Sequence, residues 1–163
     1  MTSQIDGDRL SQITQALEAT YDARSTNETR RAALEFLDGA KKQADAPQHG
    51  YSLASDPSRQ AAIRHFGLSL LEFALRYRWE DYGQNEAETL RGWILNLAQN
   101  VSESDPQYFR NKVASLWVEV AKRCWGAEWL DMDALLVALW ETTDDSKQLV
   151  YKQMVLYLSL IHI

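Results

Sequence analysis

The apolar residues of this chain recur at spacings of three and four over most of its length, and this periodicity restricts the fold more than any other feature. Between residues 85 and 101 they occupy one helical face: Leu90, Trp93, Ile94, Leu97, Ala98 and Val101. Such spacing is the pattern of an amphipathic α-helix, whereas a half-buried strand alternates with a period of two. The sequence has no alternating stretch and no Asn-Gly hairpin signal. It therefore predicts an all-α fold.

Capping residues mark where several helices begin. Asp56-Pro57 and Asp105-Pro106 each place a carboxylate before a proline, in the order typical of an N-cap and the first helical position. Seven helices are predicted from such starts and from the apolar stripes, over about 8–21, 25–44, 56–78, 85–101, 105–124, 130–141 and 146–158. The stretch 46–55 contains a proline and a glycine and is predicted to be a loop.

The helices are predicted to pair. Residues 76–79 read Arg-Tyr-Arg-Trp and residues 122–125 read Lys-Arg-Cys-Trp, so two helices end alike. Trp79 and Trp125 are 46 residues apart, within the roughly 40–47 residues of HEAT and armadillo repeats. The predicted architecture is an α-α superhelix, a HEAT-repeat solenoid of about three and a half antiparallel helix pairs. A single irregular helical bundle is the alternative.

Composition excludes several classes of function. The 163 residues carry a net charge of −6, which argues against a free-standing nucleic-acid binder. A lone Cys124 forms no disulfide within the chain and favours a reducing compartment. No apolar run reaches the roughly 18 residues needed to cross a bilayer. Neither His65 nor Cys124 lies in a catalytic motif, and no zinc spacing or phosphate-binding loop is present. The chain is predicted not to be an enzyme and to hold no cofactor or metal, and its six tryptophans are predicted to be mostly core.

Several segments resemble the exportin-5-like karyopherins of the importin-β superfamily. Residues 62–68 read Ala-Ile-Arg-His-Phe-Gly-Leu, followed by Leu-Leu-Glu at 70–72 and Arg-Tyr-Arg-Trp at 76–79, and this run is similar to the family's second-repeat A helix. Residues 118–123, Val-Glu-Val-Ala-Lys-Arg, resemble a second family motif together with Trp125, Trp129 and residues 131–132. A weaker similarity lies at 30–36. The loop 46–55 is poorer in cysteines and apolar residues than in animal members, which favours a fungal-type member.

This resemblance implies a fold and a function. Residues 1–157 would be N-terminal HEAT repeats of a nuclear export receptor that depends on the small GTPase Ran in its GTP state. Protein or RNA cargo would bind mainly to later repeats, and nucleoporins are further expected partners. Such a receptor would shuttle between nucleus and cytoplasm through the nuclear pore, without membrane association. The alternative is a HEAT-repeat scaffold for protein–protein interaction with no Ran role.

In karyopherins the first repeats hold Ran largely through their B helices, so the polar faces of the predicted B helices are the candidate Ran-binding surface. They carry mixed charge, which suits a specific protein partner better than a phosphate backbone, although any amphipathic helix has a solvated face. The candidate residues are Arg31, Glu35, Asp38, Lys42, Glu88, Asn96, Asp133 and Glu141.

The last six residues, 158–163, read Leu-Ser-Leu-Ile-His-Ile. The same peptide results from translating the transposon mosaic-end adaptor used in sequencing libraries. We therefore expect 158–163 to be a non-native tail, and the native chain to continue beyond the last predicted helix.

Overall fold

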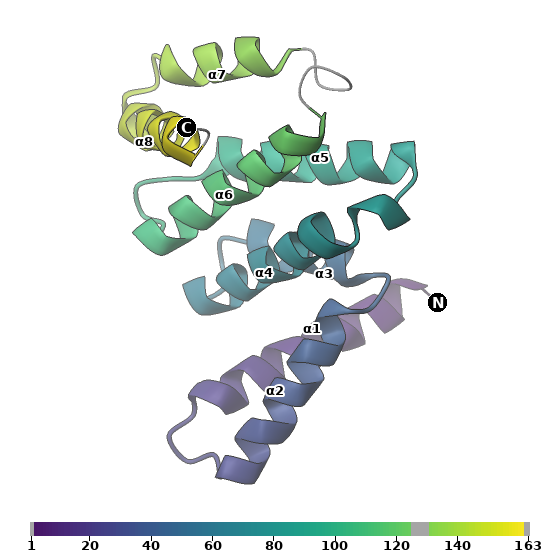
Figure 1. Ribbon diagram of the computed structural model, residues 1–163. Helices are drawn as coiled ribbons and strands as arrows, with labels where there is room; N and C mark the ends of the chain where they lie inside the picture. The colour runs from purple at the N-terminus through teal and green to yellow at the C-terminus, as the bar shows by residue number, and fades with distance from the viewer. Residues whose placement is uncertain (1, 125–130, 162–163) are drawn as a thin grey trace. The chain divides into compact units, whose positions relative to one another are not determined.

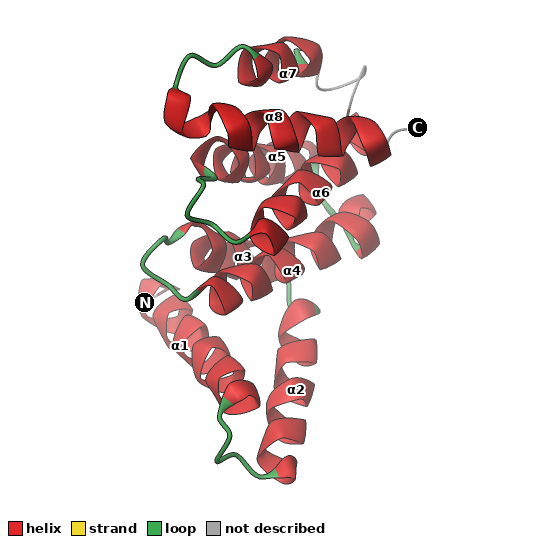
Figure 2. Ribbon diagram, turned by 90° about the vertical axis from the view of Figure 1, so that its left-hand side faces the viewer, coloured by secondary structure: helices red, strands yellow, loops and turns green. Residues whose placement is uncertain are grey.

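The structure is a computed structural model that describes residues 2–124 and 131–161, and within these ranges it contains helices and no strand (Figures 1 and 2). The α-helices are α1 (Thr2–Tyr21), α2 (Asn27–Lys41), α3 (Ala46–Ser55), α4 (Ala61–Tyr77), α5 (Gln84–Asn100), α6 (Gln107–Cys124), α7 (Met132–Trp140) and α8 (Asp145–Ile161), with a 3₁₀ turn, η1, at Trp79–Asp81. The all-α prediction is confirmed. No described helix is both long enough and apolar enough to pass through a bilayer.

Helix α3 corrects the prediction of a loop at 46–55. The proline and the glycine that suggested a loop have helical roles here. Pro47 lies in the first turn of α3, where a missing backbone N–H costs nothing. Gly50 is buried and lies close to α4, so its missing side chain lets α3 and α4 cross at short distance. It does not interrupt α3.

The chain divides into two compact units, Met1–Ala74 and Leu75–Ile163, with the boundary inside α4. In the first unit α1 packs on α2 and also contacts α3. In the second unit α5 packs on α6, α7 packs on α8, and α6 contacts α8. These contacts pair α1 with α2, α5 with α6 and α7 with α8, and a close approach of Gly50 and Gly67 pairs α3 with α4. The described residues thus contain four helix pairs, close to the three and a half predicted. Contacts between first helices (α1 with α3) and between second helices (α6 with α8) are typical of stacked helical repeats.

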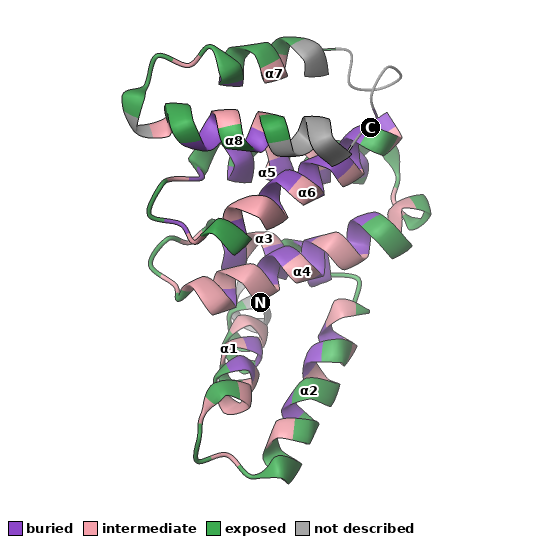
Figure 3. Ribbon diagram, turned by 60° about the vertical axis from the view of Figure 1, so that its left-hand side comes forward, coloured by how far each residue is buried: buried purple, intermediate pink, exposed green. Residues whose placement is uncertain are grey.

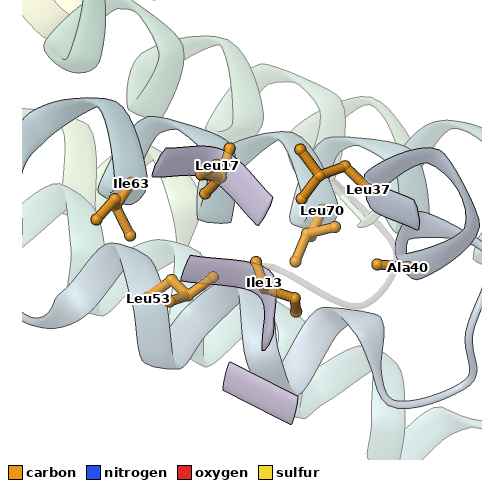
Figure 4. Packing of buried hydrophobic residues seen from close by; sticks show 7 residues of the cluster. All are labelled: Ile13, Leu17, Leu37, Ala40, Leu53, Ile63 and Leu70. Atoms are coloured by element: carbon orange, nitrogen blue, oxygen red, sulfur yellow. The ribbon is translucent and has the colours of Figure 1, made fainter. Parts of the chain in front are cut away.

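The core of the first unit is built by all four of its helices (Figure 4). Residues at helical spacing on α1 and α2 meet residues of α3 and α4. The buried members are Ile13, Leu17, Leu37, Ala40, Leu53, Ile63 and Leu70. Each of the four helices contributes an apolar stripe to this one cluster. A single helix pair could not bury its apolar residues alone, so both pairs are needed for a core.

Two glycines let α3 and α4 approach each other closely. A Cβ atom added to Gly67 would lie 2.6 Å from the carbonyl oxygen of Gly50, and one added to Gly50 would lie 2.7 Å from the carbonyl oxygen of Gly67. Nearby, the Arg64 Nε donates a hydrogen bond of 3.1 Å to the carbonyl oxygen of Ala54 at the C-terminal end of α3. The Arg-His-Phe-Gly run therefore contains two residues, Arg64 and Gly67, that hold α3 against α4.

The second unit is centred on α6, which is buried on most of its sides (Figure 3). Its buried members are Phe109, Val113, Ala114, Leu116, Trp117, Val118, Val120, Ala121 and Cys124. Trp117 is 0% exposed, as expected of a core tryptophan, whereas Trp79 and Trp93 are half-buried and Trp140 is 43% exposed. Trp125 and Trp129 lie outside the described residues. The prediction of a tryptophan-rich core is therefore correct for Trp117 and wrong for Trp140.

Candidate functional site

Helix α2 presents four of the candidate Ran-binding residues on its solvent side. Its opposite side buries Ala33, Leu37 and Ala40, which fixes the rotation of the helix. The candidates Arg31, Glu35, Asp38 and Lys42 are all exposed. Because they are spaced by three and four residues, they form one row along the helix. The structure therefore brings this half of the predicted set together.

The row begins and ends with well-defined local structure. Thr26 caps the N-terminus of α2, where the backbone N–H of Thr29 donates to Thr26 Oγ1 at 3.1 Å. At the other end Lys42 Nζ donates to Asp38 Oδ2 at 2.7 Å. The hydrogen bond and charge of Lys42 lower the pKa of the Asp38 carboxyl. Asp38 therefore remains ionised, and at neutral pH the row carries two carboxylates, Glu35 and Asp38, between two cations.

The other four candidates lie on α5 and α7, which are the first helices of their pairs. Glu88 and Asn96 are exposed on α5, and Glu141 is exposed at the C-cap of α7. The side chain of Asp133 lies outside the described residues. Since α3 is a helix, α5 and α7 are the first helices of their pairs, whereas α2, α4, α6 and α8 are the second. The assignment of residues 62–78 to a first, or A, helix and of α5 and α7 to B helices is therefore corrected.

A cluster of ionic side chains on α4 and α6 was not predicted. Glu119 of α6 is 13% exposed and contacts three cations in the second unit. Its Oε1 lies 3.4 Å from Arg76 Nη2 of α4 and 3.4 Å from Lys122 Nζ. Its Oε2 lies 3.0 Å from Arg123 Nη1, which also donates to the Glu119 carbonyl oxygen at 2.6 Å. Glu119 thus gathers three positive side chains around one carboxylate.

The residues of this ion cluster come from two of the segments that resemble exportin-5-like karyopherins. Arg76 belongs to the Arg-Tyr-Arg-Trp run, and Glu119, Lys122 and Arg123 belong to the Val-Glu-Val-Ala-Lys-Arg run. The spacing of Glu119 to Lys122 and Arg123, three and four residues, is a signal that the sequence contains. The contact with Arg76 joins residues 43 positions apart and has no local signal.

The surroundings of Glu119 act on its pKa in opposite directions. Burial raises the pKa, because it disfavours the charged form. The hydrogen bond from Arg123 and the charges of Lys122 and Arg76 lower it, and together they outweigh burial, so the pKa is lowered. The carboxylate is therefore ionised and stabilises the fold at neutral pH.

We expect Glu119 to make the stability of the second unit depend on acid pH. Because its folded-state pKa lies below the ordinary value of 4.5, its contribution is complete above the unfolded-state pKa and is lost as the pH falls through the folded-state pKa. Glu119→Gln should lower the free energy of unfolding at neutral pH by about 1–2 kcal/mol and should flatten its decline towards about pH 3. Urea unfolding of both proteins across this range measures the effect, and parallel pH profiles would contradict it.

Side chains that could bind a metal ion do not cluster anywhere in the described residues. These residues contain no group of three or more His, Cys, Asp or Glu side chains placed to hold a metal ion. Cys124 is 1% exposed, unlike the accessible thiols that act as nucleophiles. The arrangement of the described surface is that of helices with charged faces, which suits binding to other molecules.

Comparison with known proteins gives consistent matches. The Importin-beta N-terminal domain matches residues 33–119, a stretch that begins within α2 and ends within α6. Protein MSN5 of Saccharomyces cerevisiae is 35% identical over 159 residues, which are 89% of this chain and 13% of that protein. Exportin-5 of Dictyostelium discoideum is 29% identical over 142 residues, or 86% of this chain and 12% of that protein. Exportin-5 of Homo sapiens is 28% identical over 125 residues, or 74% and 10% respectively. The chain therefore spans about an eighth of the length of the first two relatives and a tenth of the third.

Proposed function

Because this chain belongs to the importin-β family of nuclear transport receptors, we propose that it forms the Ran·GTP-binding end of a nuclear export receptor. The observation that carries the proposal is the match to the Importin-beta N-terminal domain, which covers α2 to α6 and in karyopherins is the region that holds Ran. Two of the relatives described above are named exportins, which supports the outward direction of transport. The protein would act by binding and not by catalysis.

The row on α2 is the part of the candidate surface that we favour for Ran contact. In the family the second helices of the repeats line the side that meets Ran, and α2 is a second helix. Arg31, Glu35, Asp38 and Lys42 are exposed, in one row and of mixed charge, which gives a surface with a specific pattern for one protein partner. The candidates on α5 and α7 rank lower because these are first helices.

Protein or RNA cargo and nucleoporins are proposed to bind mainly outside these 163 residues, which cover 13% or less of their longer relatives. Ran·GTP and cargo would each favour the same form of the helical array, so that the binding of one strengthens the binding of the other. This coupling would make the receptor shuttle between nucleus and cytoplasm with a direction set by the nucleotide state of Ran.

A charge swap within α2 tests the proposal. Asp38→Lys combined with Lys42→Glu keeps the ion pair and the net charge but inverts the charge pattern that Ran would meet. We expect the wild-type chain to capture Ran loaded with a non-hydrolysable GTP analogue and not Ran·GDP, and the swap to weaken capture about fivefold or more. Pull-down with both nucleotide states is the measurement.

The matched control is the swap Asp22→Arg with Arg24→Asp, which inverts another exposed ion pair near the start of α2. It should leave capture unchanged, because Asp22 and Arg24 lie outside the row on α2. As an exposed ion pair they also contribute little to the stability of the fold. Capture that ignores the nucleotide, or that ignores the α2 swap, would favour the alternative of a helical scaffold without a Ran role.

A further inference from the structure

A cavity of about 390 Å³ lies among α5, α7 and α8 of the second unit. Its volume is within the roughly 300–1,000 Å³ that is typical of ligand sites. The residues that line it include none of the candidate Ran-binding residues. The cavity is therefore a feature of the second unit that the proposed function does not use.

One wall of the cavity is apolar. It is formed by Leu95 of α5 and by Leu135 and Leu139 of α7. Leu139 is buried, whereas Leu95 and Leu135 are half-buried. Ala138 adds a small side chain at an exposed position. An apolar group that entered the cavity would be removed from water against this wall, which is favourable.

Lys147 of α8 is the one charged residue among the described residues that line the cavity. Its Nζ donates a hydrogen bond of 3.2 Å to the Gln99 carbonyl oxygen and lies 6.0 Å from the centre of the Tyr151 ring. Tyr151 is buried, and its hydroxyl donates to the same carbonyl oxygen. Neither contact of the ammonium group is with a carboxylate. Because an ammonium group has three N–H donors, two of them are left for a ligand.

Helix capping accounts for only part of this arrangement. Gln99 lies in the last turn of α5, where carbonyl oxygens have no partner within the helix and where a cation is favoured. Capping thus explains one donor of Lys147 and the hydroxyl of Tyr151. It does not explain why the cation lies beside an apolar cavity.

We propose that this cavity binds the C-terminal end of a partner protein whose last residue is apolar. The terminal carboxylate would accept hydrogen bonds from Lys147, and the last side chain would lie against Leu95 and Leu135. The exposed side-chain amides of Gln99 and Asn100 would pair with the peptide groups that precede the last residue. One cation beside an apolar wall matches one carboxylate beside an apolar group, whereas a nucleic acid presents a continuous row of charges.

The surrounding charges also favour a ligand with a single negative charge. Asp144 and Asp145 precede Lys147, are exposed and do not line the cavity. Since repulsion grows with the charge of the ligand, they would disfavour an acidic run more than one terminal carboxylate. A chain end also enters the cavity from one side, whereas an internal segment must enter and leave. This inference does not depend on the proposed Ran function.

An NMR titration of the isotope-labelled 163-residue chain with the peptide Gly-Ser-Gly-Ser-Leu tests the inference. We expect the backbone amide signals of residues 95–100, 135–139 and 147–151 to shift. The same peptide with a C-terminal amide should bind about fivefold more weakly or worse. Lys147→Gln should weaken binding of the free acid by a similar factor, whereas Lys147→Arg should retain most of it. The matched control Lys152→Gln removes the same charge from α8 outside the cavity and should change binding less than about twofold.

A second substitution tests the cavity without changing its charge. Ala138→Leu fills part of the cavity from an exposed position and should weaken binding about fivefold or more, because the chain's own leucine then covers the apolar wall. Ala134→Leu, at an exposed position one turn earlier on α7 that does not line the cavity, should change binding less than about twofold. Circular dichroism and thermal unfolding verify that the variants keep their helices.

Several results would overturn the inference. The free acid could fail to shift these signals, or the amide could bind as tightly as the acid. The lysine variants Lys147→Gln and Lys152→Gln could weaken binding equally, which would show a response to net charge alone. The amide of Gly-Ser-Gly-Asp-Leu could bind as tightly as the free acid, which would indicate an internal carboxylate. Finally, decanoate could bind at the same signals more tightly than the peptide, which would indicate a small apolar acid as the ligand.

Discussion

Replacing Gly67 with alanine is expected to destabilise the first unit by about 2 kcal/mol, although the same change usually stabilises a helix. The added Cβ would lie 2.6 Å from the carbonyl oxygen of Gly50, 2.9 Å from the backbone nitrogen of Ala54 and 2.9 Å from the Cβ of Leu53. Two of these neighbours are backbone atoms, so α3 would have to move away from α4. Overpacking of this kind costs about 1–3 kcal/mol. Thermal unfolding followed by circular dichroism should show a midpoint lower by roughly 10 °C.

Gly92→Ala is the matched control. Gly92 is exposed in the middle of α5, and an added Cβ there meets nothing within 4 Å. Here only helix propensity acts, so alanine should stabilise the chain by up to about 1 kcal/mol. Opposite signs for the two substitutions would establish that Gly67 is a packing glycine. A Gly67→Ala protein as stable as the wild type would show that α3 and α4 are not held as closely as described.

Replacing Trp117 with alanine is expected to have the largest effect on the second unit. Trp117 is 0% exposed and is the largest of the fully buried side chains. Truncation removes most of an indole ring and leaves a cavity, which typically costs about 3–5 kcal/mol. That is a large share of the stability of a small unit. We expect urea unfolding to begin at much lower concentrations, and the amides of α6 to exchange with solvent more rapidly.

Trp140→Ala provides the comparison for Trp117. Trp140 is 43% exposed, and Lys152 Nζ lies 5.7 Å from the centre of its ring. Loss of this partly exposed contact should cost less than about 1 kcal/mol. Similar losses for both tryptophans would mean that burial does not distinguish them, and would contradict the placement of Trp117 at the centre of the second unit.

The α2 row could be predicted from the sequence because it depends on one helix only. Ala33, Leu37 and Ala40 define the buried side of α2, and the charged residues on the other side follow from the helical period. The other half of the candidate set depended on knowing which helices are second in their pairs. Because 46–55 was predicted to be a loop, every later helix was counted one position too early. Glu88 and Asn96 were therefore assigned to a second helix, whereas α5 is the first helix of its pair.

What the sequence determined by itself was the helical class, most of the helices and the charged face of α2, because periodicity and capping act between residues a few positions apart. The helix at 46–55 was decided by tertiary structure, since Gly50 serves a crossing with Gly67 on another helix and looks like a helix breaker when considered alone. The same holds for the ion cluster around Glu119. Glu119, Lys122 and Arg123 are neighbours by helical spacing, but only the tertiary structure of the second unit brings Arg76 to Glu119. Local patterns specify helices, whereas contacts between distant residues depend on how those helices pack.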